Sequence, residues 1–243
     1  TNDGGMGMLS ALGVKFTDKD GKNCGIFGKD LFNVENIDIS NVPNGVKESS
    51  FKIACDVNNP LCGKNGASAV FGPQKGADEK TVEAMDKALE KYAVLSEKVL
   101  GKSFKDKEGT GAAGGLGFAF VAYLNGNLMP GIELVLDMLD IEKEIKTADI
   151  VITGEGRLDS QTVMGKAPGG VAKLAKKYNL PVIAFSGCIG DGAEKCNEKG
   201  IDAFFPVVRS AVSLEEAMKK ENAEVNMYNT ALQVFRLIKT FKS

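Results

Sequence analysis

The sequence contains no histidine, and this single absence excludes several classes of catalytic site. Serine and cysteine nucleophiles that depend on a histidine base, zinc sites with histidine ligands, and histidine general bases all need a residue that the chain lacks. Proton transfer, if the chain performs any, must therefore fall to Asp, Glu or Lys side chains.

Strong net charge, long apolar runs and paired cysteines are missing as well. A net charge of -2 gives no sign of the broad basic surface that nucleic-acid binding requires. No apolar run approaches the roughly 20 residues that span a bilayer. The five cysteines are odd in number and form no C-x-x-C pair, which favours reduced structural thiols. We therefore expect a cytoplasmic protein that binds neither nucleic acid nor a membrane.

What is present indicates two successive α/β arrangements. In the first part, short strands are expected at residues 37–39 and 51–55, and a long amphipathic helix at residues 78–100. From about residue 148 onward, apolar runs alternate with helical segments. The expected strands there are 149–153, 181–187 and 203–208, and the expected helices are 167–178, 213–219 and 223–241. Such alternation predicts a parallel, Rossmann-like sheet.

We place a domain boundary near residue 146. Residues 1–146 would form a mixed α/β domain, and residues 147–243 part of a Rossmann-like domain. Three strands make a thin parallel sheet, so the second domain is expected to need further strands. The sequence starts without an initiator Met, in a loop that leads into a helix with Asp3 as a candidate cap. The thin sheet and the lack of an initiator Met both indicate an N-terminal segment that precedes this sequence.

The densest group of reactive side chains follows the strand expected at residues 149–153. Gly154 to Thr162 and the subsequent Gly165-Lys166 combine two carboxylates, a guanidinium, an ammonium and several glycines. Ligands of parallel α/β sheets bind beyond the carboxyl ends of the strands, where this segment is expected. The composition suits a site for phosphate and a metal ion together. The alternative is a solvated loop in which Arg157 pairs with Glu155 or Asp159.

Two glycine motifs fail as nucleotide-binding fingerprints. Gly165-Lys166 resembles the end of a P-loop, but Ser160 stands where the motif needs glycine, and Ala167 replaces the metal-binding Ser or Thr. Residues 109–114 match G-x-G-x-x-G but follow a polar segment instead of an apolar strand. This glycine-rich turn either lets backbone amides approach a carboxylate or phosphate, or allows tight helix packing.

Asp56 and Asn58 follow the strand expected at residues 51–55. Polar side chains at the end of a strand can orient a substrate or a metal ion. Asx residues before a proline, here Pro60, are also common as simple turn formers. The residues alone leave both interpretations open.

Several of these segments, taken in order, resemble the type I glycerate kinase family over essentially the whole chain. The matching segments are Thr1-Asn2-Asp3-Gly4-Gly5, Ala11-Leu12-Gly13, Asp56-Val57-Asn58-Asn59-Pro60-Leu61-Cys62-Gly63, Gly66-Ala67, Phe71-Gly72-Pro73-Gln74-Lys75-Gly76, Gly111-Ala112-Ala113-Gly114-Gly115-Leu116-Gly117, Thr153-Gly154-Glu155-Gly156-Arg157-Leu158-Asp159 and Gly165-Lys166. Linked blocks in a fixed order are more specific than any single glycine motif.

The resemblance implies ATP-dependent phosphorylation of D-glycerate with Mg²⁺, in a cleft between a Rossmann-like parallel-sheet domain and a second mixed α/β domain. The preferred product is 2-phosphoglycerate, and a homodimer is compatible with the sequence. The implied site residues fall into three groups. They are Asp3, Arg157, Asp159 and Lys166 for catalysis; Asp56, Asn58, Gly111, Gly114, Gly115, Gly154 and Gly156 for substrate and phosphate; and Glu155 and Asp159 for the metal.

Within this scheme, Arg157 and Lys166 offset charge on the transferring group, glycine-loop amides hold the glycerate carboxylate, and Asp3 or Asp159 accepts the hydroxyl proton. Members of the family begin with an Asp-Ser-Phe-Lys-Gly-type strand end and a Gly-Asp-Gly-Gly-Glu-Gly-type loop, and the sequence has neither. We therefore expect a truncated or split chain. The alternatives are a non-catalytic module that binds glycerate or nucleotide, and a kinase for a related small hydroxy acid.

Overall fold

The computed structural model describes residues 2–162 and 165–242, and it is an α/β structure made of two compact units. The first unit comprises Thr1–Gly131 and the second comprises Ile132–Ser243. This division falls earlier than the boundary expected near residue 146. The reason is that Leu136 and Ile145, on helices α6 (Gly131–Met138) and α7 (Ile141–Ile145), are buried in the core of the second unit.

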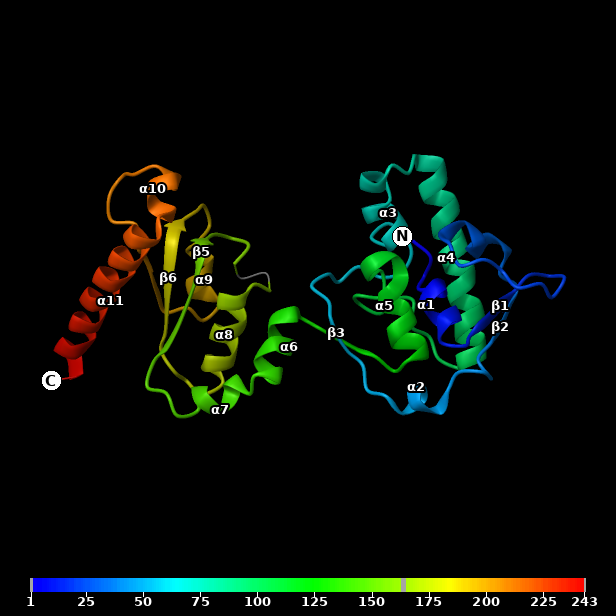
Figure 1. Cartoon of the computed structure of the whole chain (residues 1–243), viewed down its shortest axis with the longest axis horizontal. Helices are drawn as coiled ribbons and strands as arrows, with labels where there is room; N and C mark the ends of the chain where they lie inside the picture. Colours follow the sequence, from blue (N-terminus) through cyan, green and yellow to red (C-terminus); the bar gives the residue numbers. More distant parts are fainter. Residues whose placement is uncertain (1, 163–164, 243) are drawn as a thin grey trace. The chain divides into compact units, whose positions relative to one another are not determined.

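The first unit is rich in helices and holds two small sheets (Figure 1). Strands β1 and β2 pair antiparallel, whereas β3 and β4 pair parallel. Its elements in chain order are α1 (Met6–Ala11), β1 (Lys15–Thr17), η1 (Gly28–Asn33), β2 (Asn36–Asp38), α2 (Asn44–Glu48), β3 (Lys52–Ala54), α3 (Ala67–Phe71), η2 (Pro73–Lys75), α4 (Glu79–Leu100), α5 (Ala112–Tyr123) and β4 (Asn127–Met129).

Helix α4 organises the core of the first unit, as its apolar periodicity predicts. The Asp78 side chain accepts a hydrogen bond from the Thr81 amide at 2.8 Å and so caps the start of the helix, and Gly101 ends it in a left-handed conformation. The inner face buries Leu89 and Tyr92 completely, and the Tyr92 ring packs edge-on against Phe118 of α5. Complete burial of the Leu89 side chain contributes about 1.5–3 kcal/mol.

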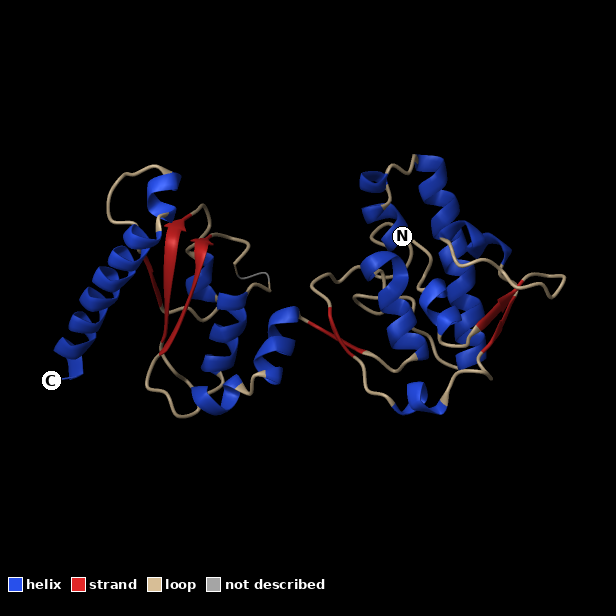
Figure 2. Ribbon diagram, viewed as in Figure 1, coloured by secondary structure: helices blue, strands red, loops and turns tan. Residues whose placement is uncertain are grey.

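The second unit contains a parallel three-stranded sheet in the order β5-β6-β7 (Figure 2). Its elements after α6 and α7 are β5 (Val151–Leu158), α8 (Ala167–Lys176), β6 (Val182–Ile189), α9 (Lys195–Glu198), β7 (Ala203–Pro206), α10 (Leu214–Met218) and α11 (Lys220–Lys242). Side chains of β6 alternate between the two faces of the sheet. Val182 and Ala184 share a core with α8, whereas Ile183 and Phe185 share one with Val234 of α11.

Strand β5 extends further than its apolar residues indicate. The sequence predicts that the strand ends at Thr153 and that a loop begins at Gly154, but the strand continues to Leu158. The additional residues are paired with β6, because Gly154 lies opposite Phe185 and Leu158 opposite Ile189. Glu155 and Arg157 are therefore held on a strand, and the turn begins only after Leu158.

The carboxylate of Glu97, near the end of α4, anchors the segment that leads to the glycine-rich turn. Its Oε1 accepts hydrogen bonds from the amides of Phe104 at 2.6 Å and Lys105 at 3.0 Å, and from the Ser103 hydroxyl at 3.0 Å. Burial raises the pKa of Glu97, but these hydrogen bonds outweigh it and hold the pKa below its ordinary value. The stabilisation is therefore present above the unfolded-state pKa and is lost as the pH falls through the folded-state pKa.

Glu97→Gln is expected to lower the melting temperature at pH 7. Below about pH 4.5, the melting temperature of this variant should fall less steeply with decreasing pH than that of the unaltered protein. Because Glu97 is half-buried and its hydrogen bonds are partly screened by solvent, the cost at pH 7 is about 1 kcal/mol. Thermal melts followed by circular dichroism between pH 3 and pH 7 measure both effects. The control is Glu83→Gln, which removes only an exposed pair with Lys87. If the melting temperatures of the Glu97 variant and the unaltered protein fell equally between pH 7 and pH 3, Glu97 would not be the source of this pH dependence.

None of the helices in the described part of the chain combines the length and the apolar character that crossing a bilayer requires.

Candidate functional site

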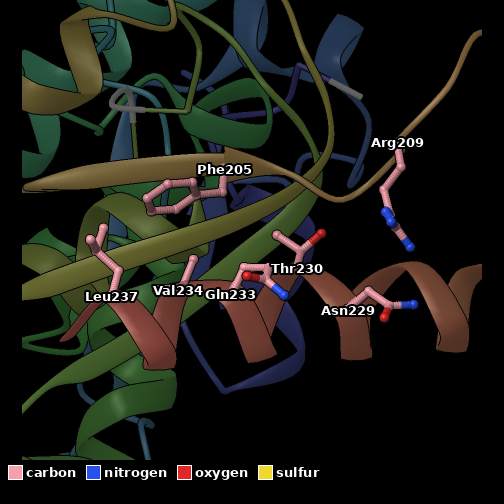
Figure 3. Close-up of a pocket in the computed structure, with 7 residues that line it drawn as sticks. All are labelled: Phe205, Arg209, Asn229, Thr230, Gln233, Val234 and Leu237. Atoms are coloured by element: carbon pink, nitrogen blue, oxygen red, sulfur yellow. The ribbon is translucent and has the colours of Figure 1, made fainter. Parts of the chain in front are cut away.

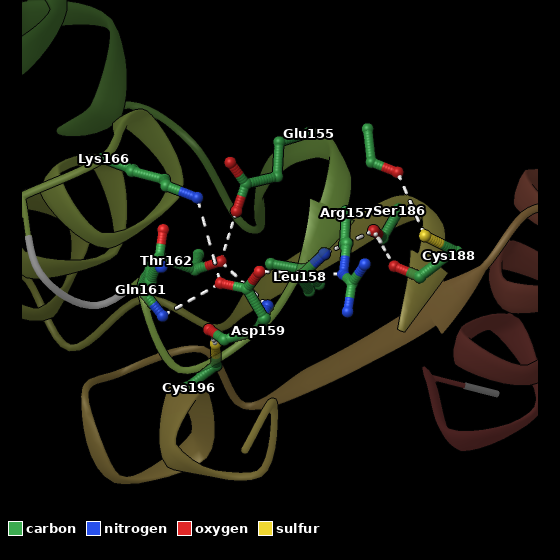
Figure 4. A network of polar contacts seen from close by, with 11 residues as sticks. Glu155, Arg157, Leu158, Asp159, Gln161, Thr162, Lys166, Ser186, Cys188 and Cys196 are labelled. Carbon is green, nitrogen blue, oxygen red and sulfur yellow. Dashed lines mark hydrogen bonds and ion pairs between the residues drawn. The ribbon is translucent and has the colours of Figure 1, made fainter. Parts of the chain in front are cut away.

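A cluster of charged side chains lies at the carboxyl end of β5 (Figure 4). Glu155 and Arg157 stand two residues apart on the strand, so they project from the same face of the sheet. Asp159 begins the turn after the strand, and Lys166 directly precedes α8. The residues that the sequence singles out for phosphate and metal are thus brought together at the sheet edge where parallel α/β folds bind ligands.

Asp159 is the centre of this cluster. Its Oδ1 accepts a hydrogen bond from the Gln161 amide at 2.9 Å and lies 3.8 Å from Lys166 Nζ, and its Oδ2 lies 3.7 Å from Arg157 Nε. Both cation distances exceed the roughly 2.8 Å of a direct charge-assisted hydrogen bond. The Arg157 side chain is 62% exposed and that of Lys166 41%. Arg157 and Lys166 therefore lie near Asp159 without forming a direct charge-assisted hydrogen bond with it.

Arg157 occupies a place that a neighbouring glycine leaves open. A Cβ atom at Gly190 would come within 2.6 Å of Arg157 Nε, so a larger residue there would displace the guanidinium. The Gly190 amide also donates to the Leu158 carbonyl at 2.7 Å, which joins the ends of the two segments. Glycine at position 190 therefore lets the arginine lie along the sheet edge.

Two candidate glycines of β5 have different surroundings. A Cβ atom at Gly154 would come within 2.3 Å of the Phe185 carbonyl oxygen, so glycine is required there by the close approach of β6. A Cβ atom at Gly156 would meet nothing within 4 Å. The packing of the sheet thus accounts for Gly154, while Gly156 leaves an open stretch of backbone beside Glu155 and Arg157.

Two buried hydroxyl groups support the cluster, and neither was singled out by any sequence pattern. Thr162 Oγ1 accepts from the Asp159 amide at 3.1 Å and donates to Glu155 Oε1. Ser186 Oγ accepts from the Leu158 amide at 2.9 Å and donates to the Cys188 carbonyl at 2.6 Å. Both residues are 1% exposed or less. Hydroxyl residues are common in loops and strands, so only their burial and partners distinguish them.

The thiol of Cys196, which lies 4.0 Å from the Asp159 carbonyl, does not add a nucleophile to the cluster. Burial and, after it, the negative charges of Glu155 and Asp159 raise the pKa of the Cys196 thiol. Burial likewise raises the pKa of Cys62 to about 12. Both thiols stay protonated near neutral pH, as expected for structural cysteines.

The donor set for a metal ion consists of the carboxylates of Glu155 and Asp159. Within the described ranges, no group of three or more Cys, Asp or Glu residues is arranged to hold a metal ion. Mg²⁺ is commonly bound by one or two carboxylates together with substrate phosphates and water. The two carboxylates therefore fit an ion that arrives with a nucleotide, and do not form a complete cage for one.

In the first unit, the Asp3 carboxylate accepts hydrogen bonds from nearby backbone amides. The side chain is 8% exposed, and its Oδ1 and Oδ2 accept hydrogen bonds from the amides of Gly5 at 3.2 Å and Gly7 at 3.0 Å. These contacts hold the segment that leads into α1, but the N-cap residue of the helix is Gly5, so the expectation that Asp3 occupies the cap position is wrong. They fix the position of the carboxylate but do not show a catalytic role.

The glycine-rich turn is shaped by close packing at two of its candidate positions. A Cβ atom at Gly111 would come within 2.2 Å of the Pro60 carbonyl oxygen, and one at Gly115 within 2.7 Å of Gly4 Cα. The Gly114 carbonyl accepts the Gly4 amide at 3.0 Å. Ala113, Gly114 and Gly115 all have positive φ values of 50°, 69° and 90°. The packing interpretation therefore accounts for these glycines, and their role in ligand binding stays a prediction.

Asp56 and Asn58 follow β3 as expected, at the carboxyl end of the parallel pair β3-β4. Asp56 Oδ1 accepts a hydrogen bond from the Gly131 amide at 2.8 Å, which ties together the chain segments that follow the two strands. Asn58 is exposed. Asp56 thus has a structural partner, while Asn58 is accessible to a ligand.

A cavity of about 300 Å³ lies between β7 and α11 and contains none of the predicted site residues (Figure 3). It is lined by Phe205, Arg209, Asn229, Thr230, Gln233, Val234 and Leu237. All four of its polar side chains are at least partly exposed, so the cavity has no buried polar group to define a ligand.

Comparison with known proteins gives one consistent family. The description "Glycerate kinase family" matches residues 1–239. The chain is 46% identical over 243 residues to a protein named glycerate kinase from Bacillus subtilis (strain 168), covering 100% of this chain and 63% of that protein. It is 47% identical over 219 residues to a protein named glycerate 2-kinase from Escherichia coli (strain K12), covering 90% of this chain and 58% of that protein.

A solved structure agrees with these matches. The crystal structure of a candidate glycerate kinase 2 from Salmonella typhimurium LT2 is similar with a TM-score of 0.82 at 44% identity, and the match covers 100% of this chain and 62% of that one. The chain therefore spans about three fifths of the length of the relatives that it matches.

Proposed function

Because the chain belongs to the glycerate kinase family, we propose that it transfers a phosphoryl group from ATP to D-glycerate. The observation that carries the proposal is the cluster at the end of β5, where Arg157 and Lys166 approach opposite oxygens of Asp159. Phosphoryl transfer depends chiefly on positioning and on stabilising negative charge, so it needs no histidine.

Arg157 and Lys166 bind the phosphate groups in this proposal. Their distances of 3.7 and 3.8 Å from Asp159, together with their exposure, allow either side chain to turn toward an anionic ligand. The guanidinium can donate two parallel hydrogen bonds to phosphoryl oxygens, whereas the ammonium acts as a point charge. Lys166 also directly precedes α8, whose first amides favour an anion.

Glu155 and Asp159 would hold Mg²⁺, since hard carboxylate oxygens are its preferred protein ligands. When bound there, the ion would neutralise part of the negative charge of the nucleotide phosphates. The contribution of the chain is to hold the two carboxylates in place, Glu155 through Thr162 and Asp159 through the Gln161 amide.

Glycerate recognition is assigned to the first unit by the same proposal. Exposed Asn58 is available to a hydroxyl or carboxylate, and the amides of the glycine-rich turn would hold the glycerate carboxylate. The acceptor of the hydroxyl proton is Asp3 or Asp159. The amides of Gly5 and Gly7 hold the Asp3 carboxylate in place, and Arg157 and Lys166 lie within 4 Å of the Asp159 carboxylate.

The purified protein is expected to release ADP from magnesium-ATP only when D-glycerate is present, and to form 2-phosphoglycerate. A coupled assay measures the ADP, and ³¹P NMR against authentic 2- and 3-phosphoglycerate identifies the product. A panel of related hydroxy acids, including L-glycerate, lactate and glycolate, serves as the control. Turnover of another acid in preference to D-glycerate would contradict the substrate assignment, and ligand-induced thermal stabilisation without turnover would favour a binding module.

The proposal also places the protein in the cytoplasm, supported by five cysteines that are all free thiols. A homodimer and the lack of nucleic-acid binding stay predictions from the sequence. Association measured by analytical ultracentrifugation would test the first of these.

A further inference from the structure

Thr162 is a polar residue with an unusual position, because it is 0% exposed although it lies in the turn after β5. Its backbone amide donates to the Asp159 carbonyl at 3.1 Å, which closes the turn. Its hydroxyl accepts from the Asp159 amide at 3.1 Å and donates to Glu155 Oε1. One side chain therefore joins the strand that carries Glu155 to the turn that carries Asp159.

The direction of these two hydrogen bonds is fixed by the partners. The Asp159 amide can only donate, so Thr162 Oγ1 must accept from it. The single hydroxyl proton is then left for Glu155, which accepts it as a carboxylate. A hydrogen bond to an ionised partner in a buried setting is stronger than a neutral one.

Threonine suits this task better than a flexible residue. Its β-branched side chain has few χ1 states, so the hydroxyl is held in one direction. Within residues 2–162 and 165–242, Glu155 accepts this hydrogen bond at Oε1, so the bond does not occupy Oε2. Figure 4 shows Thr162 between Glu155 and Asp159, with Lys166 reaching toward the same group.

We propose that Thr162 is a positioning residue for phosphoryl transfer: its buried hydroxyl holds the Glu155 carboxylate and the Asp159 turn in the arrangement that binds a magnesium-nucleotide complex. The inference rests on the proposed function. Thr162 touches neither the phosphate nor the metal in this scheme, and it acts through the two carboxylates. Partners that orient metal ligands in this way typically change metal affinity or activity 10- to 100-fold when removed.

The test compares Thr162→Val, which keeps the shape but removes the hydroxyl, with Thr162→Ser, which keeps the hydroxyl. The valine variant is expected to bind magnesium-ADP at least about 10-fold more weakly by calorimetry and to lose about 10- to 100-fold in kcat, with KM for D-glycerate nearly unchanged. The serine variant is expected to stay within about threefold of the unaltered protein, since one hydroxyl can satisfy both partners. Equal losses in both variants would overturn the proposal.

A matched control separates positioning from general stability. Ser96 is also 0% exposed, and its hydroxyl donates to the Tyr92 carbonyl at 2.8 Å inside the first unit. Ser96→Ala is expected to lower the melting temperature without changing the affinity for magnesium-ADP. If Thr162→Val behaves in the same way, with reduced stability and unchanged nucleotide affinity, Thr162 has only a structural role and the proposal fails.

A double variant tests whether Thr162 acts through Glu155. If it does, adding Thr162→Val to Glu155→Gln weakens magnesium-ADP binding less than Thr162→Val does in the unaltered protein, because only the contact with the Asp159 turn is left to lose. Fully additive losses would overturn the proposal. Failure of the unaltered protein to phosphorylate D-glycerate would count against the proposed function alone, because magnesium-ADP binding reports on Thr162 without turnover. Failure of the unaltered protein to bind magnesium-ADP would overturn both.

Discussion

Replacing Arg157 with alanine is expected to lower kcat for glycerate phosphorylation by about 100- to 1,000-fold, the usual effect of removing one donor that stabilises transition-state charge. The guanidinium lies at the carboxyl end of β5, 3.7 Å from Asp159 and 62% exposed. It is therefore available to an anion that develops charge during the reaction. Because it would act mainly on the transition state, KM for D-glycerate should change little.

The stability of this variant should match that of the unaltered protein. An ion pair as open as that between Arg157 and Asp159 contributes about 0–1 kcal/mol, and the aliphatic part of the side chain is mostly exposed. Arg157→Lys should recover only part of the rate, since an ammonium cannot donate two parallel hydrogen bonds.

The control for Arg157 is Arg236→Ala on α11, which removes an exposed arginine from another part of the second unit. Steady-state kinetics and thermal melts of all three variants supply the measurement. Unchanged kinetics for Arg157→Ala would remove this residue from the proposed site. A loss of rate accompanied by a lower melting temperature would instead indicate a disturbed end of β5.

Gly115→Ala is expected to destabilise the protein by about 2–5 kcal/mol. The residue has a φ of +90°, a conformation that costs an L-residue about 1–2 kcal/mol. The new Cβ atom would also come within 2.7 Å of Gly4 Cα and 2.9 Å of Leu61 Cδ1, and overpacking of this kind adds about 1–3 kcal/mol. For a chain of this size, each kcal/mol lowers the melting temperature by roughly 2–4 °C.

Gly76→Ala separates the two contributions. Gly76 has a φ of +91°, nearly the value at Gly115, but a Cβ atom there meets nothing within 4 Å. This variant is therefore expected to carry only the conformational cost. Denaturation followed by circular dichroism compares both variants with the unaltered protein. Equal stability losses would show that contact with the Gly4 backbone does not define the glycine-rich turn.

Elements with strong local signals could be predicted from the amino-acid sequence alone. Helix α4 has an amphipathic pattern over many turns, Asp78 at its start and Gly101 at its end, and it forms over Glu79–Leu100 as predicted. The apolar runs near residues 181–187 and 203–208 likewise become β6 and β7. In each case a repeated apolar face or an uninterrupted apolar run selects the structure whatever the neighbours are. The family was also determined at this level, because its motifs are linked blocks in a fixed order.

Features that depend on pairing between distant segments could not be predicted without the three-dimensional structure. Gly154 and Gly156 have no preference for a strand, yet β5 continues through them because β6 supplies hydrogen-bond partners. The units divide after Gly131 because Leu136 and Ile145 are buried in the second core, which an amphipathic pattern cannot assign to one of two neighbours.

The candidate site shows the same distinction. Charge and position in the chain were enough to select Glu155, Arg157, Asp159 and Lys166, which the structure brings together. They could not select Thr162, because the value of a hydroxyl depends on burial and on the geometry of two partners. Charge and position also could not distinguish packing from ligand binding at Gly115. There the backbone of Gly4, more than a hundred residues away in the chain, lies so close that no side chain fits. Local patterns determine elements and chemical types, whereas contacts between distant segments determine which of those groups are held in place.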